Sequence, residues 1–396
     1  MTFPDPLPQE TERAYLAGQG KKPTGSLGHP QKSRFPTRLL SYVLLALAFA
    51  SISTLSLVFI YHHVAGRSYF LKLDIFPRST IIRVIVLLFF YHLFDALRFS
   101  YILKTLNARV PFRYLIKLVF INIFISNITP FATGGGFAQI YFLNKAGVSV
   151  GAATAATTIR TILAMIFLFT ITPVVILTEK NLAAILPARS LFSYLSLLPM
   201  IYLFALYMIT LQNKMIKRFL YGFLGRLRNA NLISPETSQR VAFRIFREIN
   251  AFSRSIKIFL SGERSYAFAA VLSTLLFLLA LFMFSVVLIS GLHYEISPFS
   301  VISFQVVIAF IMYFAPTPGA TGVAEGGYAL LFSHFVKKSD IVSLTFAWRF
   351  ITVYIGMIVG GLIFYMEIRK GYQKRKTDRE SIRSGHHPGR PARPFP

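Results

Sequence analysis

Apolar stretches of about twenty residues alternate with short polar ones along most of this chain. Twenty helical residues span roughly 30 Å, the thickness of the hydrocarbon core of a bilayer. The pattern therefore predicts an all-α polytopic membrane protein. The expected helical segments are residues 39–61, 80–103, 112–129, 151–178, 190–210, 265–290, 298–315 and 341–366.

Charge is distributed unevenly over the loops between these segments. The loop around Lys104 and Arg109 is basic, and residues 212–264 carry eleven Lys or Arg against three acids. Basic loops are retained on the cytoplasmic side of a membrane. We therefore expect the N-terminus, residues 212–264 and the C-terminal tail to be cytoplasmic.

This orientation fails if all eight segments cross the membrane, because residues 212–264 would then be external. It holds if segments 112–129 and 298–315 enter the membrane and return through the glycine-rich stretch that follows each. Non-helical backbone is tolerated at membrane depth only where protein or a water-filled cavity surrounds it. The sequence thus predicts about six full spans plus two re-entrant helical hairpins.

The two glycine-rich stretches resemble each other. One reads "PFATGGGFAQ" from residue 130 and the other "PTPGATGVAE" from residue 316. The matched positions are Pro130 with Pro316, Gly136 with Gly322, Ala138 with Ala324, and Gln139 with Glu325. Such self-similarity indicates an internal duplication. The hairpins would open from opposite sides of the membrane, so the repeats are expected to be inverted.

Each stretch is followed by a span that holds one arginine. Arg160 and Arg349 lie about ten residues into their spans, which places them about 15 Å deep, near the middle of the membrane. Charges at this depth are costly and usually serve a function or pair with another charge. We expect the two arginines to meet there. The alternative is that each arginine only pairs with an acid and holds two helices together.

The second span adds His92, Asp95 and Arg98 at three-residue steps along one helical face. Asp95 and Arg98 are positioned to pair, whereas His92 is more typical of a core or interfacial histidine than of a ligand. The three arginines are opposed by Asp95 and Glu325, which leaves one positive charge. An anionic phosphate headgroup would balance it.

The glycines of both stretches permit tight turns and close approach of the backbone. Half-helices that begin there would point their N–H groups at an anion, as in the broken helices of transporters. The alternative is that the glycines only allow close helix packing. The candidate headgroup-binding residues are Pro130, Gly135, Gly136, Gln139, Arg160, Pro316, Pro318, Gly319, Gly322, Glu325, Arg349, Asp95 and Arg98.

Composition and the absence of known motifs argue against several kinds of site. The chain is 54% hydrophobic and contains no cysteine, so no disulfide or thiolate site is expected. No metal-ligand spacing, nucleotide loop or hydrolase motif occurs, so neither a metal nor a cofactor is expected. The net charge is +27, but the sequence has no basic-aromatic motif of the kind that binds nucleic acid, so no nucleic-acid partner is expected. The positive charge favours contact with anionic membrane lipids.

The polar ends of the chain flank one membrane domain. Residues 1–38 and 369–396 are polar and basic and are expected to be disordered, and the membrane domain covers residues 39–368. Within it, residues 212–264 contain amphipathic patterns. They are interpreted either as helices lying on an anionic leaflet or as a helical hairpin packed under the membrane domain.

The paired loops resemble the signature loops of the lysylphosphatidylglycerol synthase transmembrane region, also called the flippase-like domain family. "DALRFSYIL", from Asp95, resembles the second-span pattern of that family. Phe137 stands where many relatives have proline, and Ala320 where glycine is common. The resemblance implies a domain that moves lipids or lipid-linked precursors between leaflets. Only a short tail follows Arg369, so the soluble aminoacyl-transferase activity of full-length synthases is not expected.

The leading functional hypothesis is therefore a plasma-membrane lipid translocase for a phospholipid or lipid-linked glycan with an anionic headgroup. Without a nucleotide site, transport would be facilitated or ion-coupled. One alternative is an accessory protein that scaffolds a lipid- or glycan-modifying enzyme. Another is an enzyme that acts on lipid within the membrane.

The predicted orientation can be tested by labelling. Because the chain has no native cysteine, Ser238→Cys introduces a single thiol into residues 212–264. We expect this thiol to resist a membrane-impermeant reagent added to intact cells and to react after permeabilisation. Labelling from outside would contradict the six-span topology.

Overall fold

The computed structural model describes residues 75–180 and 256–383 continuously and only scattered residues elsewhere. All secondary structure in this part of the chain is helical. The expected segments 39–61 and 190–210 and most of 212–264 lie outside the described residues.

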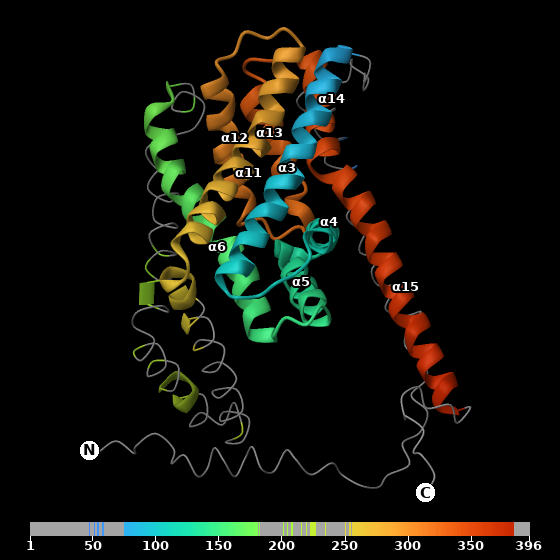
Figure 1. Ribbon diagram of the computed structural model, residues 1–396. Helices are drawn as coiled ribbons and strands as arrows, with labels where there is room; N and C mark the ends of the chain where they lie inside the picture. The colour runs from blue at the N-terminus through green and yellow to red at the C-terminus, as the bar shows by residue number, and fades with distance from the viewer. Residues whose placement is uncertain are drawn as a thin grey trace, which may run out of the picture. The chain divides into compact units, whose positions relative to one another are not determined.

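Twelve elements are described (Figure 1), and the helices expected at residues 80–103, 112–129, 151–178, 265–290 and 298–315 are found close to these bounds. They are α3 (Arg78–Thr105), α4 (Phe112–Ile128), the 3₁₀ turn η1 (Pro130–Ala132), α5 (Thr133–Lys145), α6 (Val150–Thr178), α11 (Arg264–Gly291), α12 (Pro298–Met312), the 3₁₀ turn η2 (Pro318–Ala320), α13 (Val323–Phe332), α14 (Lys338–Arg349), the π-helical η3 (Phe350–Tyr354) and α15 (Ile355–Arg383).

Four of the described helical stretches are long and apolar enough to cross a membrane: 78–105, 150–178, 264–291 and 338–371. Their outer faces expose large apolar side chains, such as Ile82 and Phe89 of α3. Apolar side chains on an outer surface suit contact with lipid.

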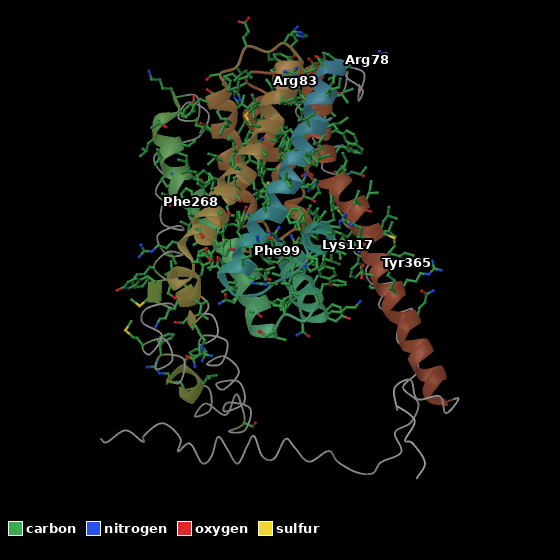
Figure 2. All side chains as sticks on the ribbon, in the orientation of Figure 1. Arg78, Arg83, Phe99, Lys117, Phe268 and Tyr365 are labelled. Atoms are coloured by element: carbon green, nitrogen blue, oxygen red, sulfur yellow. The ribbon has the colours of Figure 1, made fainter. Side chains whose placement is uncertain are left out.

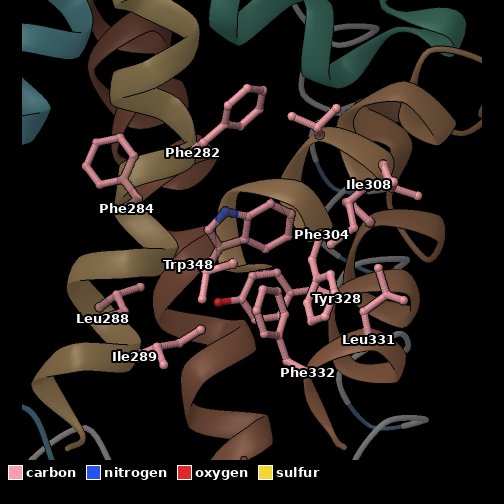
Figure 3. Close-up of a cluster of buried hydrophobic side chains, with 14 of the residues drawn as sticks. Phe282, Phe284, Leu288, Ile289, Phe304, Ile308, Tyr328, Leu331, Phe332 and Trp348 are labelled. Atoms are coloured by element: carbon pink, nitrogen blue, oxygen red, sulfur yellow. The ribbon is translucent and has the colours of Figure 1, made fainter. Parts of the chain in front are cut away.

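The interior of the bundle is a continuous apolar core. Helix α3 packs along α11, and α6 packs against α12 (Figure 1). Figure 3 shows the aromatic part of this core, in which Trp348 stacks on Tyr328 with ring centroids 4.5 Å apart. Phe332 packs against the Tyr328 ring, and Phe304 packs against Phe332. This packing fixes α13 and α14 relative to each other.

Two helical hairpins share one construction. The first is α4–η1–α5 and the second is α12–η2–α13, and the tips η1 and η2 pack against each other. Each hairpin is followed by a helix that carries a buried arginine, Arg160 on α6 and Arg349 on α14. The two stretches that resemble each other in sequence therefore each form the tip of a helical hairpin, and the two tips lie in contact.

The glycines of the first tip do not make its turn, contrary to the sequence interpretation. The left-handed residues there are Phe131 (φ 52°) and Ala132 (φ 53°). Gly134 and Gly135 lie in the first turn of α5, where a Cβ would collide with side chains at the end of α4. These glycines serve the close approach of α5 to α4, which was the other role expected of them.

The C-terminal boundary also differs from expectation. Helix α15 continues through Arg369 to Arg383, so the first half of the segment expected to be a disordered tail is helical. Lys, Arg, Glu and Gln are good helix formers, and elongating an existing helix requires no new nucleus.

Helices α4 and α15 approach each other closely. Lys117 of α4 lies beside α15 and pairs with Glu367 at 3.3 Å (Figure 2). A Cβ on Gly360 would overlap the backbone carbonyl of Phe120, whereas one on Gly361 would make ordinary contact with the Phe124 ring.

This contact predicts different outcomes for two neighbouring substitutions. Gly360→Ala should separate α4 from α15 and destabilise the protein by about 1–3 kcal/mol, as overpacking against backbone does. Gly361→Ala is the matched control and should leave stability nearly unchanged. The thermal midpoint of each purified variant in detergent measures the difference, and equal midpoints would contradict the close contact.

Candidate functional site

A cavity of about 550 Å³ lies where the two hairpin tips meet. Its wall is formed by residues from α3, α4, α5, α6, α11, α12, α14 and η3 and from both tips. The volume lies within the range of about 300–1,000 Å³ that is usual for ligand sites. Three arginines border it: Arg98, Arg160 and Arg349.

In the second repeat, Arg349 is held by the tip and by α13. Its Nε donates to Glu325 Oε1 at 2.7 Å, and one terminal nitrogen donates to the carbonyl of Gly319 at 2.8 Å. The other Glu325 oxygen accepts from the backbone N–H of Gly322 at 2.7 Å. Arg349 is 1% exposed and Glu325 is fully buried. One carboxylate therefore orients the arginine and caps the start of α13.

This contact explains the backbone of the second tip. Gly319, Ala320 and Gly322 have φ values of 60°, 54° and 89°. The turn directs the Gly319 carbonyl to Arg349 and the Gly322 N–H to Glu325. Left-handed backbone is favourable for glycine and strained for alanine, so Ala320 departs from the family pattern at a position whose conformation suits glycine.

In the first repeat, one carboxylate holds two arginines. Asp95 accepts from Arg98 Nε at 2.6 Å within α3 and, with both oxygens, from Arg160 of α6 at 2.6 Å. The Arg98 guanidinium also stacks 3.8 Å above the Phe277 ring. The pairing of Asp95 with Arg98 is confirmed, and Asp95 is also the partner of Arg160.

The repeats differ at the matched positions Gln139 and Glu325. Gln139 is fully buried and borders the cavity, but Arg160 binds Asp95 instead of this amide. Neither the Oε1 nor the Nε2 of Gln139 has a hydrogen-bond partner among the described residues. Similar sequence thus gives two different arrangements of charge.

The remaining predicted residues divide into two groups. Gly136 and Gly319 border the cavity, as do Gln139 and the three arginines. The second group does not line the cavity. Asp95 and Glu325 bind the arginines from behind, and the other members lie in or next to the tips: Pro130, Gly135, Pro316, Pro318 and Gly322. His92 packs against Tyr91 and Phe120 away from the cavity, in line with its interpretation as a core residue.

Sequence reasoning missed most of the cavity wall, including two residues with large polar or aromatic side chains. Gln305 of α12 is 2% exposed and Trp348 precedes Arg349 on α14. A signal existed for Gln305, because a polar side chain inside an apolar helix at membrane depth is usually functional. Trp348 carries no such signal, since aromatic residues are common in apolar cores.

Comparison with known proteins agrees with this architecture. The family described as "Lysylphosphatidylglycerol synthase TM region" matches residues 39–360, and the chain belongs to that family. The chain is 24% identical to a UPF0104 membrane protein of Archaeoglobus fulgidus over 282 residues, 71% of this chain and 84% of that protein. It is 27% identical to a UPF0104 membrane protein of Pyrococcus horikoshii over 285 residues, 68% of this chain and 81% of that protein. The protein is thus a multi-pass membrane protein.

The two carboxylates should differ in their importance for stability. Asp95→Asn leaves two buried arginines without a carboxylate, and losing one partner of a buried pair typically costs about 3–5 kcal/mol. Glu325→Gln should cost less, because the amide oxygen still accepts from Gly322 and Arg349 keeps the Gly319 carbonyl. Thermal midpoints and monodisperse yield in detergent compare the two. A Gln variant less stable than the Asn variant would contradict this order.

Proposed function

We propose that the protein moves a lipid with an anionic phosphate headgroup between the two leaflets of the membrane. The observation that carries the proposal is the charge of the cavity. Arg98, Arg160 and Arg349 border it, and among the described residues only Asp95 and Glu325 pair with them, so three positive and two negative charges leave one positive charge. A phosphodiester carries the single negative charge that balances it.

The proposed topology places this cavity in the middle of the bilayer. Helices α4 and α12 have 17 and 15 residues, fewer than the approximately 20 that a span needs. We therefore interpret both hairpins as re-entrant and inverted, within about six full spans when the segments outside the described residues are included. Both termini and residues 212–264 would be cytoplasmic, in a plasma membrane whose anionic leaflet attracts the basic segment.

Transport then requires only binding and movement of the chain. The N-termini of α5 and α13 begin at the two tips, where helix dipoles favour an anion. The π-helical turn η3 directly follows Arg349, and such turns often occur at functional sites. The sequence has no nucleotide-binding motif, so movement would be facilitated or ion-coupled. The proposal assigns no catalytic step to the protein.

Leaflet exchange in reconstituted vesicles tests the proposal. Purified protein is placed in vesicles that contain a headgroup-labelled anionic phospholipid, and the label that becomes accessible from outside is followed with time. We expect exchange to be faster than in protein-free vesicles. Equal rates would contradict transport and favour an accessory role beside a lipid- or glycan-modifying enzyme.

Two charge-removing variants locate the activity. Glu325→Gln should fold and lose most of the exchange activity, because Arg349 is then no longer held toward the cavity by a carboxylate. Glu367→Gln removes a carboxylate that pairs with Lys117 and Lys145 outside the cavity and should exchange lipid like the wild type. A folded Glu325→Gln protein with wild-type exchange would remove Glu325 from the mechanism.

A further inference from the structure

A second cavity, of about 430 Å³, lies between the end of α3 and the start of α4. It shares no residue with the cavity at the hairpin tips. Its apolar part is formed by Leu103, Val110 and Leu115, and two cations, Lys104 and Arg109, line the same space. Apolar surface beside positive charge suits a ligand that has an apolar part and an anionic part.

The charges of this second cavity are not balanced within the described part of the chain. Lys104 and Arg109 are both exposed, and neither forms an ion pair with an acid among the described residues. The backbone N–H groups of Arg109 and Val110 have no hydrogen-bond partner there either. The cavity thus offers two positive charges and several N–H donors, which fit the oxygens of an anion.

The position of the second cavity favours a lipid as the source of that anion. Lys104 lies in the last turn of α3, a helix long and apolar enough to span a membrane, so the cavity lies near the membrane surface. The Lys104 ammonium is 5.3 Å from the ring centroid of Tyr101 and 5.6 Å from that of Tyr266, and the two rings stack. Tyrosine is enriched at this boundary, and the cation–π contacts hold the ammonium beside the cavity.

The number of cations indicates the kind of phosphate. A phosphomonoester carries about −1.5 to −2 charges at pH 7, whereas a phosphodiester carries one. Two cations without acidic partners therefore match a monoester better than a diester. Basic pockets between transmembrane helices are a general means of binding lipid headgroups.

We infer that this cavity is a second binding site, which holds the phosphomonoester headgroup of a membrane lipid. The phosphate contacts Lys104 and Arg109, and the apolar part of the lipid lies against Leu103 and Leu115. The lipid is a bound ligand at the membrane surface and is not the molecule that the central cavity would move. The site therefore stands or falls separately from the proposed function.

Binding to the purified full-length protein in detergent tests this site. Isothermal titration measures affinity, and native mass spectrometry counts the lipids that remain bound. The probes are dioctanoyl phosphatidic acid, which is a monoester, dioctanoyl phosphatidylmethanol, which is a diester with the same chains, and inorganic phosphate. We expect phosphatidic acid to bind about tenfold more tightly than phosphatidylmethanol, as one charge-assisted contact contributes. Inorganic phosphate should bind more weakly than either lipid, because it makes no apolar contact.

Two substitutions that remove the same charge separate this site from general attraction to a basic loop. Arg109→Gln should weaken the binding of phosphatidic acid about tenfold, because Arg109 lines the cavity. Arg113→Gln is the matched control: Arg113 is also exposed and lies four residues further on, but it does not line the cavity. It should bind phosphatidic acid like the wild type. Both variants should keep the thermal midpoint of the wild type without lipid, since neither arginine is buried.

Three results would each overturn the inference. Equal weakening by Arg109→Gln and Arg113→Gln would show unspecific attraction. Equal affinity of the wild type for the two lipids would reject a monoester site, and inorganic phosphate that binds as tightly as phosphatidic acid would show an ion site only. Leaflet exchange is measured apart from these titrations, so its absence would reject transport and leave the lipid site in place.

Discussion

A charged side chain at membrane depth requires a partner, and this requirement organises the described part of the molecule. Arg98, Arg160 and Arg349 are at most 6% exposed in a bundle whose other buried residues are mostly apolar. Their partners connect separate helices: Asp95 joins α3 to the distant α6, and Glu325 joins α13 to the next helix, α14. Buried ion pairs often contribute little net stability, because desolvation offsets their attraction. Here they hold three arginines in fixed positions beside one cavity.

The same requirement explains why the chain can end helices in the centre of the bundle. A helix that ends in an apolar medium leaves backbone N–H and C=O groups without partners. At the second tip, two charged side chains supply these partners. Arg349 donates to the Gly319 carbonyl, and Glu325 accepts from the Gly322 N–H. At the first tip, Thr129 accepts from the Gly134 N–H and donates to the Ile125 carbonyl. At the second tip, the residues that contribute charge beside the cavity therefore also stabilise the broken helix, whereas at the first tip a neutral threonine does so.

Hydropathy and turn residues were sufficient to predict the bounds of most described helices, the two helix–turn–helix stretches and the buried arginines, because these features depend on local composition. The partner of Arg160 was not assigned, since Asp95 lies 65 residues away on a helix outside the repeated motif. The left-handed Phe131 and Ala132 were missed because neither residue type indicates that conformation. Trp348 and Gln305 became functional candidates only when packing placed them on the cavity wall.

The difference between the repeats determines the sign of the cavity. Each repeat contributes a hairpin and an arginine, but only the second contributes a carboxylate at the matched position, because Gln139 stands where Glu325 stands in the other. A glutamate at position 139 would bring three acids to the three arginines, and a neutral site has no electrostatic preference for an anion. The amide removes that charge and leaves a buried group that α5 does not satisfy. The two similar stretches thus differ by one charge at the matched position, and this difference leaves three arginines with two carboxylate partners among the described residues.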